Sequence, residues 1–494
     1  MRWRPVTRPP EDPVDDGRLV APRPLFVRAL DAASIATACL AIYVTVAGPV
    51  VLLRYGEFTL PSNPFLFFVC ASLVAIRHAA RPRPALSTVV AARWARIEAR
   101  PHAAAAIRAF VSTRLMVFVV AYFAVVTIGF PPRPVGFTLS SDPLANLPAR
   151  YDAGWYADIA RSGYSWDEQF ERQRNIAFFP ALPILMRPVG SFFGANAPTL
   201  QRERRVLRML WGGVVVSLAA FAWALYYVSR LGGLLSGTAA ATAAPLLLAS
   251  YPFAIFFSAP YTESLFLLGC AGAFYHFHRQ HWVRASAWGL LVGLTRPNGC
   301  LTSVALAMLA VQQVWPVFRA SRATPAAWLT PLARRLLVAS MPGVAMLIFT
   351  AYLYYLSGIW FLWARIQGTW GRTWGTRPLE QGWEWLTTEG VMQVSAGVPF
   401  DVLNTLAVLF MLVMLVPILR RLGAAYAMFV LLNLVPPIFA GGALSMGRIT
   451  STLFPAFLAL AALLPARAVP AWAAAFAIMQ GLIAALFFTW REIF

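Results

Sequence analysis

The residue of this chain most suited to chemistry is Asp152, a carboxylate among aromatic side chains in the stretch RYDAGWY that begins at Arg150. The stretch follows an apolar run long enough to cross a bilayer, and an acidic side chain at such an edge is costly unless it has a role. Partial loss of water around the carboxylate suits a general base, which takes a proton from a reacting hydroxyl. The structural alternative is that Asp152 caps a short helix over residues 153–162. The residues alone leave both roles open, and Asp152 is the first candidate for a catalytic residue.

Four residues near Asp152 are candidates for substrate binding. They are Tyr151, Trp155, Tyr156 and Asp158. Asp158 lies six residues after Asp152, so a helix places the two carboxylates on different faces. We therefore expect no close acid–base pair between them.

Glu263 opens an apolar run in the stretch SAPYTES, which begins at Ser258. It either belongs to a capping box with Thr262 or Ser258, or it contacts a substrate at the external rim of the membrane. We include Glu263 among the candidate substrate-binding residues.

Two arginines at membrane edges are candidates for binding a lipid phosphate. Arg296 lies in the stretch TRPNG between two short apolar runs, and Arg448 opens another run. A cation buried there must be paired or must await an anion, and the guanidinium fork fits phosphate oxygens. The alternative for Arg296 is an internal ion pair with Glu263. Asn298, two residues after Arg296, joins the substrate-binding candidates.

A second group of candidates lies in the long loop over residues 358–401, which is rich in Trp and Arg. Trp faces stack on the C–H surfaces of sugars, although Trp also occupies membrane interfaces in general. From this loop we select Arg365 and Arg372 for phosphate binding, and Trp370 and Trp374 for substrate binding.

The elements that position these residues follow from composition. Of 494 residues, 59% are hydrophobic and 12% are charged, which lies outside the range of soluble domains. Apolar runs of about 20 residues fit helices that cross a bilayer, whereas open sheets leave backbone groups unsatisfied in lipid. We predict an all-α, polytopic membrane protein of about thirteen transmembrane helices. The expected spans cover residues 32–53, 62–80, 109–130, 206–229, 237–257, 262–278, 283–296, 299–315, 336–357, 402–419, 424–441, 449–465 and 470–489.

The distribution of arginine predicts the orientation of these spans. The N-terminal tail and the Arg-rich segment 80–108 are expected in the cytoplasm, the latter as an amphipathic surface helix. The loops over 131–205 and 358–401 then lie on the non-cytoplasmic side. Arginine is expected mainly in cytoplasmic loops. One cluster would lie outside instead, and it comprises Arg202, Arg204, Arg205 and Arg208.

An alternative topology makes residues 176–195 a full span, but it moves the arginines between Arg319 and Arg335 outside. The prolines at 180, 183 and 188 also argue against an ordinary span. We therefore expect residues 178–193 to form a helix along the membrane surface.

Neither the net charge nor the Cys and His residues indicate a class of protein other than a helical membrane protein. The net charge of +21 arises in loops where topology selection places Arg, so a basic face for nucleic acid is not predicted. The four Cys lie inside apolar runs, which argues against a disulfide framework. The five His lie at membrane exits without carboxylate or thiolate company, so a metal cluster is not expected. The chain has no Walker loop, dinucleotide fingerprint, CxxC pair or HExxH motif.

Four motifs in order resemble those of a known family. They are the aromatic-Asp stretch at Tyr151 with its Trp-Tyr, Ile-Ala and Gly-Tyr pairs, then FFP at Phe178, SAPYTES at Ser258 and TRPNG at Thr295. On these motifs the chain resembles the PIG-V-type mannosyltransferases, relatives of the second GPI mannosyltransferase within the GT-C glycosyltransferases. The resemblance covers roughly residues 109–465. The family often has Trp before the Asp, where this chain has Tyr151.

The resemblance implies a GT-C-like fold and an inverting transfer of a hexose, typically mannose, from a polyprenyl-phosphate carrier to an acceptor hydroxyl. It implies an active site on the periplasmic or external face of the cell inner membrane, with Asp152 as base and Arg296 or Arg448 beside the departing phosphate. The implied partners are the polyprenyl-phosphate sugar donor, membrane lipids, and an acceptor that is a glycolipid, a polysaccharide or a protein. No nucleic acid is implied. A divalent metal cofactor is not expected, because the external loops hold no dense carboxylate cluster.

The expected organisation has four parts. They are a disordered cytoplasmic tail over 1–31, an additional N-terminal hairpin with the Arg-rich segment over 32–108, a catalytic membrane domain over 109–465 and a C-terminal helix over 466–494. A lipid or sugar transporter is the main alternative function, and it predicts two matching broken segments. Only one Gly/Pro-interrupted pair is evident, around Arg296, which favours the transferase. A scaffold protein, the third alternative, needs no carboxylate poised beside aromatics.

Overall fold

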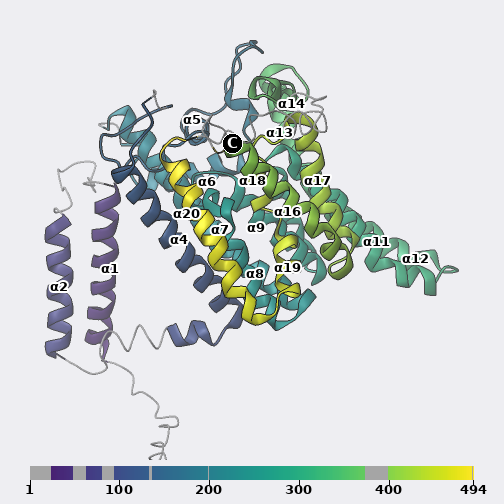
Figure 1. Ribbon diagram of the computed structural model, residues 1–494, viewed down its shortest axis with the longest axis horizontal. Helices are drawn as coiled ribbons and strands as arrows, with labels where there is room; N and C mark the ends of the chain where they lie inside the picture. The colour runs from purple at the N-terminus through teal and green to yellow at the C-terminus, as the bar shows by residue number, and fades with distance from the viewer. Residues whose placement is uncertain are drawn as a thin grey trace, which may run out of the picture. The chain divides into compact units, whose positions relative to one another are not determined.

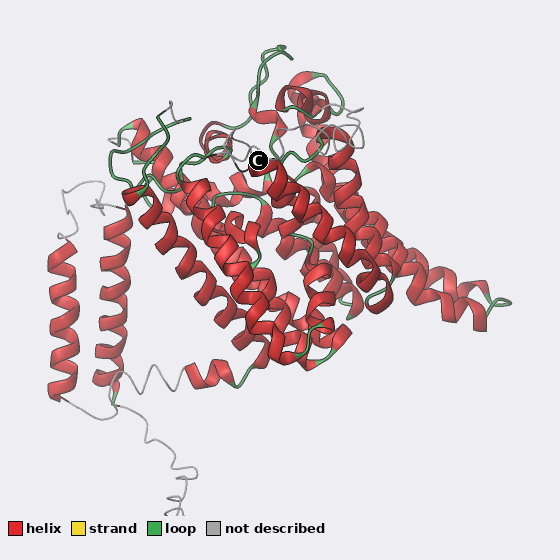
Figure 2. Cartoon of the chain, viewed as in Figure 1, coloured by secondary structure: helices red, strands yellow, loops and turns green. Residues whose placement is uncertain are grey.

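The computed structural model describes residues 24–47, 63–80, 94–132, 136–197, 200–372, 399–491 and 493. The chain divides into two compact units, Met1–Ala95 and Arg96–Phe494, and each is described by itself. Every regular element in the described ranges is a helix, so the predicted all-α class is confirmed for them (Figure 2).

The first unit contains a helical hairpin of α1 (Leu25–Ala47) and α2 (Asn63–Ala80), which pack along each other. A buried ion pair joins the two helices, with Arg77 Nε donating to Asp31 Oδ1 at 2.8 Å. Because charges in an apolar hairpin are costly unless they are paired, this contact fixes the register of the two helices.

The second unit is a bundle of helices (Figure 1), and its short 3-10 helices are given the label η here. Its first elements are α4 (Pro101–Thr127), α5 (Ala153–Ser162), η1 (Asn175–Ala177), α6 (Ala181–Phe192), α7 (Arg202–Ser236), α8 (Thr238–Ser250), η2 (Pro252–Ser258) and α9 (Glu263–His278). The middle elements are α10 (Trp282–Gly293), η3 (Pro297–Leu301), α11 (Thr302–Ala320), α12 (Pro325–Ala339), α13 (Met341–Ser357), α14 (Leu362–Arg365) and η4 (Ile366–Trp370). The last elements are α16 (Pro399–Arg421), α17 (Ala424–Gly441), α18 (Met446–Ser451), α19 (Phe454–Leu463), η7 (Ala466–Ala468) and α20 (Val469–Phe488).

Fewer helices are long enough to cross a membrane than the sequence predicts. Within the described residues, six helices are both long and apolar enough, and up to eight if two bent helix pairs each count as one span. Each of the other expected segments is also helical, but several of these helices are short: α9 has 16 residues and α10 has 12. Hydropathy alone therefore overestimates the spans, because an apolar helix inside the bundle resembles one that crosses the bilayer.

The bundle contains two bent pairs in addition to the break expected around Arg296. The axis turns by 82° between α8 and η2 and by 43° between α12 and α13. The expectation of a single Gly/Pro-interrupted pair was therefore wrong, because a proline also marks each of these two bends. Proline begins η2 at Pro252 and occupies the first turn of α13 at Pro342.

A buried arginine stabilises the sharper bend. Arg114 on α4 donates to the carbonyl oxygens of Ala254 at 2.7 Å and Ala249 at 2.8 Å, and to Ser258 Oγ at 2.8 Å. Gln480 on α20 also donates to Ala249 O at 3.0 Å. Broken helices expose carbonyl groups that must find donors in an apolar interior, and these two side chains supply them.

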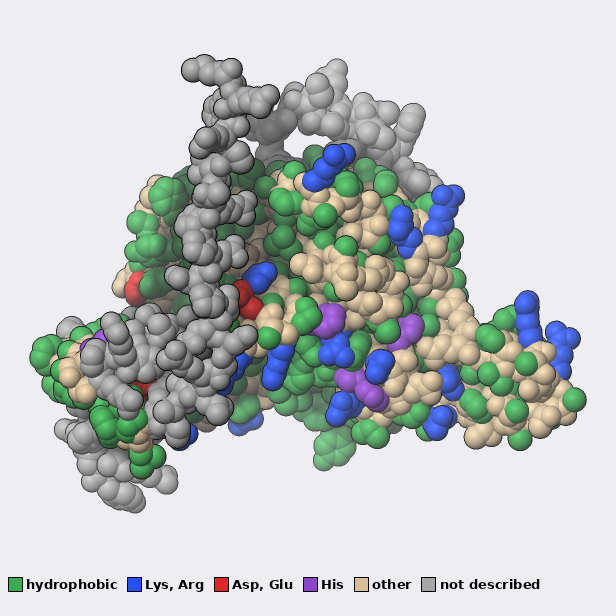
Figure 3. Space-filling view, turned by 90° about the horizontal axis from the view of Figure 1, so that it is seen from below, with side chains coloured by type: hydrophobic (Ala, Val, Ile, Leu, Met, Phe, Trp, Pro, Cys, Tyr) green, Lys and Arg blue, Asp and Glu red, His purple; other side chains and the backbone are tan. Residues whose placement is uncertain are grey.

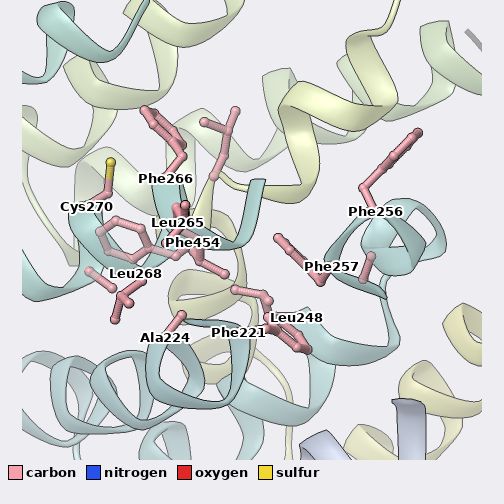
Figure 4. Close-up of a cluster of buried hydrophobic side chains, with 14 of the residues drawn as sticks. Phe221, Ala224, Leu248, Phe256, Phe257, Leu265, Phe266, Leu268, Cys270 and Phe454 are labelled. Carbon is pink, nitrogen blue, oxygen red and sulfur yellow. The ribbon is translucent and has the colours of Figure 1, made fainter. Parts of the chain in front are cut away.

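The apolar core lies between α7, α8, α9 and α19 (Figure 4). The rings of Phe221 and Phe257 stack with centroids 4.3 Å apart and planes 12° apart. Phe256 and Phe266, at the edge of the cluster drawn in Figure 4, also contact the cations of the candidate site described below.

Basic side chains gather at one end of the second unit (Figure 3). Figure 1 places α5 and α14 at one end of this unit, and Figure 3 views the opposite end, where Arg and His side chains gather. Hydrogen bonds tie part of this group together: Arg230 donates to Tyr226 Oη at 2.8 Å, and ring nitrogens of His276 and His281 lie 3.1 Å apart. An Arg-rich end is what the sequence predicts for the cytoplasmic side.

Candidate active site

Asp152 is the N-cap residue of α5, whose bounds Ala153–Ser162 agree with the predicted helix. Gly163 ends the helix at a φ of 80°, a left-handed conformation that glycine adopts without strain. The side chain of Asp152 makes no capping hydrogen bond. Its Oδ2 instead accepts a hydrogen bond from Arg448 Nη1 at 2.6 Å. Asp152 therefore occupies the N-cap position, as the capping alternative predicts, but its side chain does not cap the helix.

The backbone before Asp152 is held in an unusual conformation. Tyr151 has a φ of 44°, which is strained for a residue with a side chain. Two contacts with the end of α20 hold it there: Tyr151 Oη donates to Arg491 O at 2.7 Å, and Arg150 Nε donates to Phe488 O at 2.8 Å. The C-terminal helix, which the sequence places outside the catalytic domain, thus helps to aim Asp152.

Tyr261 provides a second support that the sequence reasoning did not select. Its hydroxyl donates to Arg150 O and accepts from the backbone N–H of Asp152, both at 3.2 Å. Burial raises the pKa of Tyr261 well above its usual value, so the hydroxyl stays neutral and can donate. Its only signal in the sequence is its place in the SAPYTES motif.

Glu263 links the two predicted arginines. It is fully buried in the first turn of α9, accepts a hydrogen bond from Arg448 Nε, and has its Oε1 3.1 Å from Arg296 Nη2. No capping hydrogen bond forms at Thr262, so the capping-box alternative for Glu263 was wrong. The internal ion pair expected as the alternative for Arg296 is present.

The charges of this cluster remain only partly satisfied. Burial opposes the charge of Arg448, but Glu263 and Asp152 outweigh it and hold the pKa of Arg448 above its usual value. Arg296 Nε and Nη2 and Glu263 Oε2 are buried without a hydrogen-bond partner in the structure. Buried polar groups usually have partners, so Arg296 retains the capacity to bind an anion.

Arg372 adds a third cation to the cluster. Burial, and then the charge of Arg448, lower its pKa to about 10, so it remains protonated at neutral pH. No ion pair or hydrogen bond joins its guanidinium to another residue in the described part of the chain. The cluster thus contains three arginines and two carboxylates, Asp152 and Glu263, and has a net charge of +1.

An aromatic wall lies beside these charges and joins the two long loops. The Trp155 ring stacks on Phe178 with centroids 6.0 Å apart, and Trp370 packs edge-on against both at 5.4 and 5.1 Å. Trp370 Nε1 is buried without a hydrogen-bond partner in the structure. Tyr156 packs on Phe178 at 5.1 Å, and burial raises its pKa to about 12.

Other predicted residues lie apart from the cluster. Asp158 pairs with Arg161 at 3.4 Å and accepts from Asn175 at 3.0 Å, which agrees with the expected separation from Asp152. Asn298 donates to Asn433 Oδ1 at 2.7 Å and thereby connects η3 to α17.

Arg365 and Trp374 are the remaining candidates of the second loop. Arg365 is exposed on α14, and no bond joins it to Asp152, Glu263 or Arg448. Trp374 lies outside the described residues. Across the ranges that the structure covers, no group of three or more His, Cys, Asp or Glu side chains is arranged to hold a metal ion.

Comparison with known proteins agrees with the motifs. Residues 137–359 match the family model described as mannosyltransferase (PIG-V). The matched segment contains Asp152, Glu263 and Arg296, and it ends before Arg372 and Arg448. No curated protein matches the chain. The resemblance drawn from the four motifs is thereby confirmed.

Proposed function

From the membership of the chain in the mannosyltransferase (PIG-V) family, which rests on residues 137–359, we propose that it moves a hexose, mannose in the first place, from a polyprenyl-phosphate carrier to an acceptor hydroxyl. Family membership and the apolar helices make the chain a membrane-embedded glycosyltransferase. The donor, the mechanism and the orientation described below are our proposal.

The observation that carries the proposal is the arrangement of Asp152. Arg448 holds Oδ2, whereas Oδ1 has no hydrogen-bond partner among the described residues, and the side chain is 20% exposed. A carboxylate fixed through one oxygen and accessible through the other suits a general base, which must reach the proton that it removes.

The proposed reaction is a single displacement at the anomeric carbon of the sugar. Asp152 Oδ1 takes the proton of the acceptor hydroxyl while that oxygen forms a bond to the anomeric carbon. The bond from this carbon to the phosphate oxygen breaks, and its electron pair leaves with the polyprenyl phosphate. Attack opposite to the leaving group inverts the configuration, and no metal takes part in these steps.

The leaving phosphate gains negative charge, and the cluster supplies cations for it. Arg372 is the strongest candidate because no carboxylate pairs with it in the described residues. Arg296 adds a buried Nε–H group that has no hydrogen-bond acceptor among the described residues. Fixed cations that face developing charge in a site with little water lower the barrier substantially. Arg448, which bonds two carboxylates, acts mainly by positioning Asp152.

The aromatic wall is the proposed sugar platform. Trp155 and Trp370 pack on Phe178, which also contacts Tyr156 beside the charged cluster. The Nε1 of Trp370, which has no hydrogen-bond partner among the described residues, can donate to a sugar hydroxyl. Trp374 stays a prediction for the same role. We place the site on the periplasmic or external face of the inner membrane, because the Arg- and His-rich end of the bundle is the opposite one (Figure 3).

The test is a transfer assay with purified protein, radiolabelled polyprenyl-phosphate mannose and a membrane lipid extract. Transferase activity yields a labelled product that is resolved from the donor by chromatography. A transporter instead moves the labelled donor across the bilayer of a proteoliposome and forms no product. The second outcome would replace the proposed function with the transporter.

A further inference from the structure

A basic cleft lies apart from the candidate active site. It has a volume of about 510 Å³ and is bounded by the C-terminal end of α5, by α6 and by the N-terminal end of α7. Its charged lining residues are Arg161, Arg187, Arg202 and Arg205, and none of the described residues that line it is acidic. Three of these arginines belong to segments that the proposed reaction does not use, namely α6 and α7.

The N-terminus of α7 lies at the cleft and adds to its positive potential. α7 begins at Arg202, and its N-cap residue, Gln201, makes no side-chain capping bond, so the positive end of the helix dipole adds to the charge of the cleft. Among the described residues, Arg161 pairs with Asp158 at 3.4 Å, and this exposed pair contributes little. The cleft therefore favours an anion.

The surroundings of the cleft are apolar. α6, which carries Arg187, exposes Ile184 and Phe192 to 61% and 75%. From its basic first turns, α7 continues as a helix long and apolar enough to cross the membrane. Charges at the end of a span lie at the depth of lipid headgroups. A positive cleft with an apolar border at this depth fits a phosphate that is attached to acyl chains.

We propose that this cleft binds the phosphodiester headgroup of an anionic phospholipid. The phosphate lies among Arg161, Arg187 and Arg202, and the acyl chains lie along the exposed apolar side chains of α6. The site is distinct from Asp152, which sits at the other end of α5, about 13 Å away for a helix of this length. A lipid ligand would explain why Arg202 and Arg205 lie outside although arginine is expected mainly in cytoplasmic loops: both line the cleft that binds it.

The test measures lipid binding to the full chain in detergent by native mass spectrometry, which needs no transfer activity. The probes are dioctanoyl phosphatidylglycerol and, as the zwitterionic comparison, dioctanoyl phosphatidylcholine. We expect saturable binding of the anionic lipid, and an affinity at least about tenfold lower in the variant Arg187→Gln with Arg202→Gln. The matched control is Arg204→Gln, which removes an exposed arginine of the same turn that does not line the cleft, and it keeps wild-type affinity.

Three outcomes would overturn the proposal. Equal losses in the cleft variant and in Arg204→Gln would show diffuse attraction without a site. Unchanged affinity in the cleft variant would exclude these arginines. Displacement of the lipid by an equal concentration of inorganic phosphate would make free phosphate the ligand. If the double variant does not elute as a folded monomer, Arg202→Gln alone decides the same question, since Arg202 is exposed.

Discussion

At the scale of single residues, the site depends on one guanidinium that serves two carboxylates. Arg448 bonds Asp152 through Nη1 and Glu263 through Nε, and Glu263 is fully buried. The sequence identifies these three residues as candidates, but it does not predict that they meet. They are separated by 185 and 296 positions, and only tertiary packing brings such distant side chains together. Arg448 thus holds the proposed base, Asp152, through a hydrogen bond in addition to any contact with a phosphate.

We predict that donor binding depends on the protonation of Arg372. Burial and the charge of Arg448 lower its pKa to about 10. A cation keeps its proton below its pKa, so Arg372 is charged at neutral pH and loses its charge as the pH rises through about 10. The KM for the donor should therefore rise in this window. In Arg372→Gln the KM should be roughly tenfold higher already at neutral pH and should show no such step.

The control for this measurement is Arg365→Gln, which removes an exposed arginine of the same loop. Its pH profile should match that of the wild type. A persistent step near pH 10 in Arg372→Gln would assign the titration to another group and remove Arg372 from phosphate binding.

At the scale of elements, the close approach of α18 to η2 sets the position of Arg448. Gly447 precedes Arg448, and a Cβ at this position would lie 2.2 Å from Cε1 of Phe253 on η2. The N–H of Gly447 donates to Asn404 Oδ1 at 2.6 Å. Ser445, at the start of α18, has a φ of 60°, a second strained position next to the site. Only glycine allows this approach.

Gly447→Ala should therefore displace α18 and move Arg448 away from Asp152. We expect kcat to fall by about 100-fold, because an error of about 1 Å in a positioned group is enough for such a loss, and we expect a lower thermal unfolding midpoint. Gly343→Ala is the matched control in α13, since its Cβ would have Ser303 Oγ as nearest neighbour at 3.6 Å. Similar kcat values for the two variants would show that the approach of α18 does not position the site.

At the scale of the whole molecule, the sequence predicts helices well and their roles less well. The bounds of α5 and α17 agree with the predicted 153–162 and 424–441, because apolar runs between polar breaks define them. α9 was expected as a span, yet every residue from Glu263 to Phe277 is buried within the bundle. The bend supported by Arg114 was also missed, because its carbonyl partners are revealed only by the fold.

The orientation of the molecule can be tested with single cysteines. We predict that residues 131–205 face the outside and that the turn between α11 and α12 faces the cytoplasm. In a variant without its four native cysteines, Arg172→Cys should react with a membrane-impermeant maleimide on intact cells, whereas Arg322→Cys should react only after permeabilisation. Both arginines are exposed, so accessibility to solvent does not limit labelling. The reverse labelling pattern would show that residues 131–205, which include Asp152, face the cytoplasm.

The most direct measurement compares Asp152→Asn with Asp158→Asn in turnover of polyprenyl-phosphate mannose. Both changes neutralise a carboxylate at α5, but only the first removes the proposed base. Asp152→Asn should fold and insert normally and lose at least about 100-fold in kcat, the usual contribution of a general base. Asp158→Asn should stay within a few-fold of the wild type. Near-normal turnover by Asp152→Asn would contradict the account.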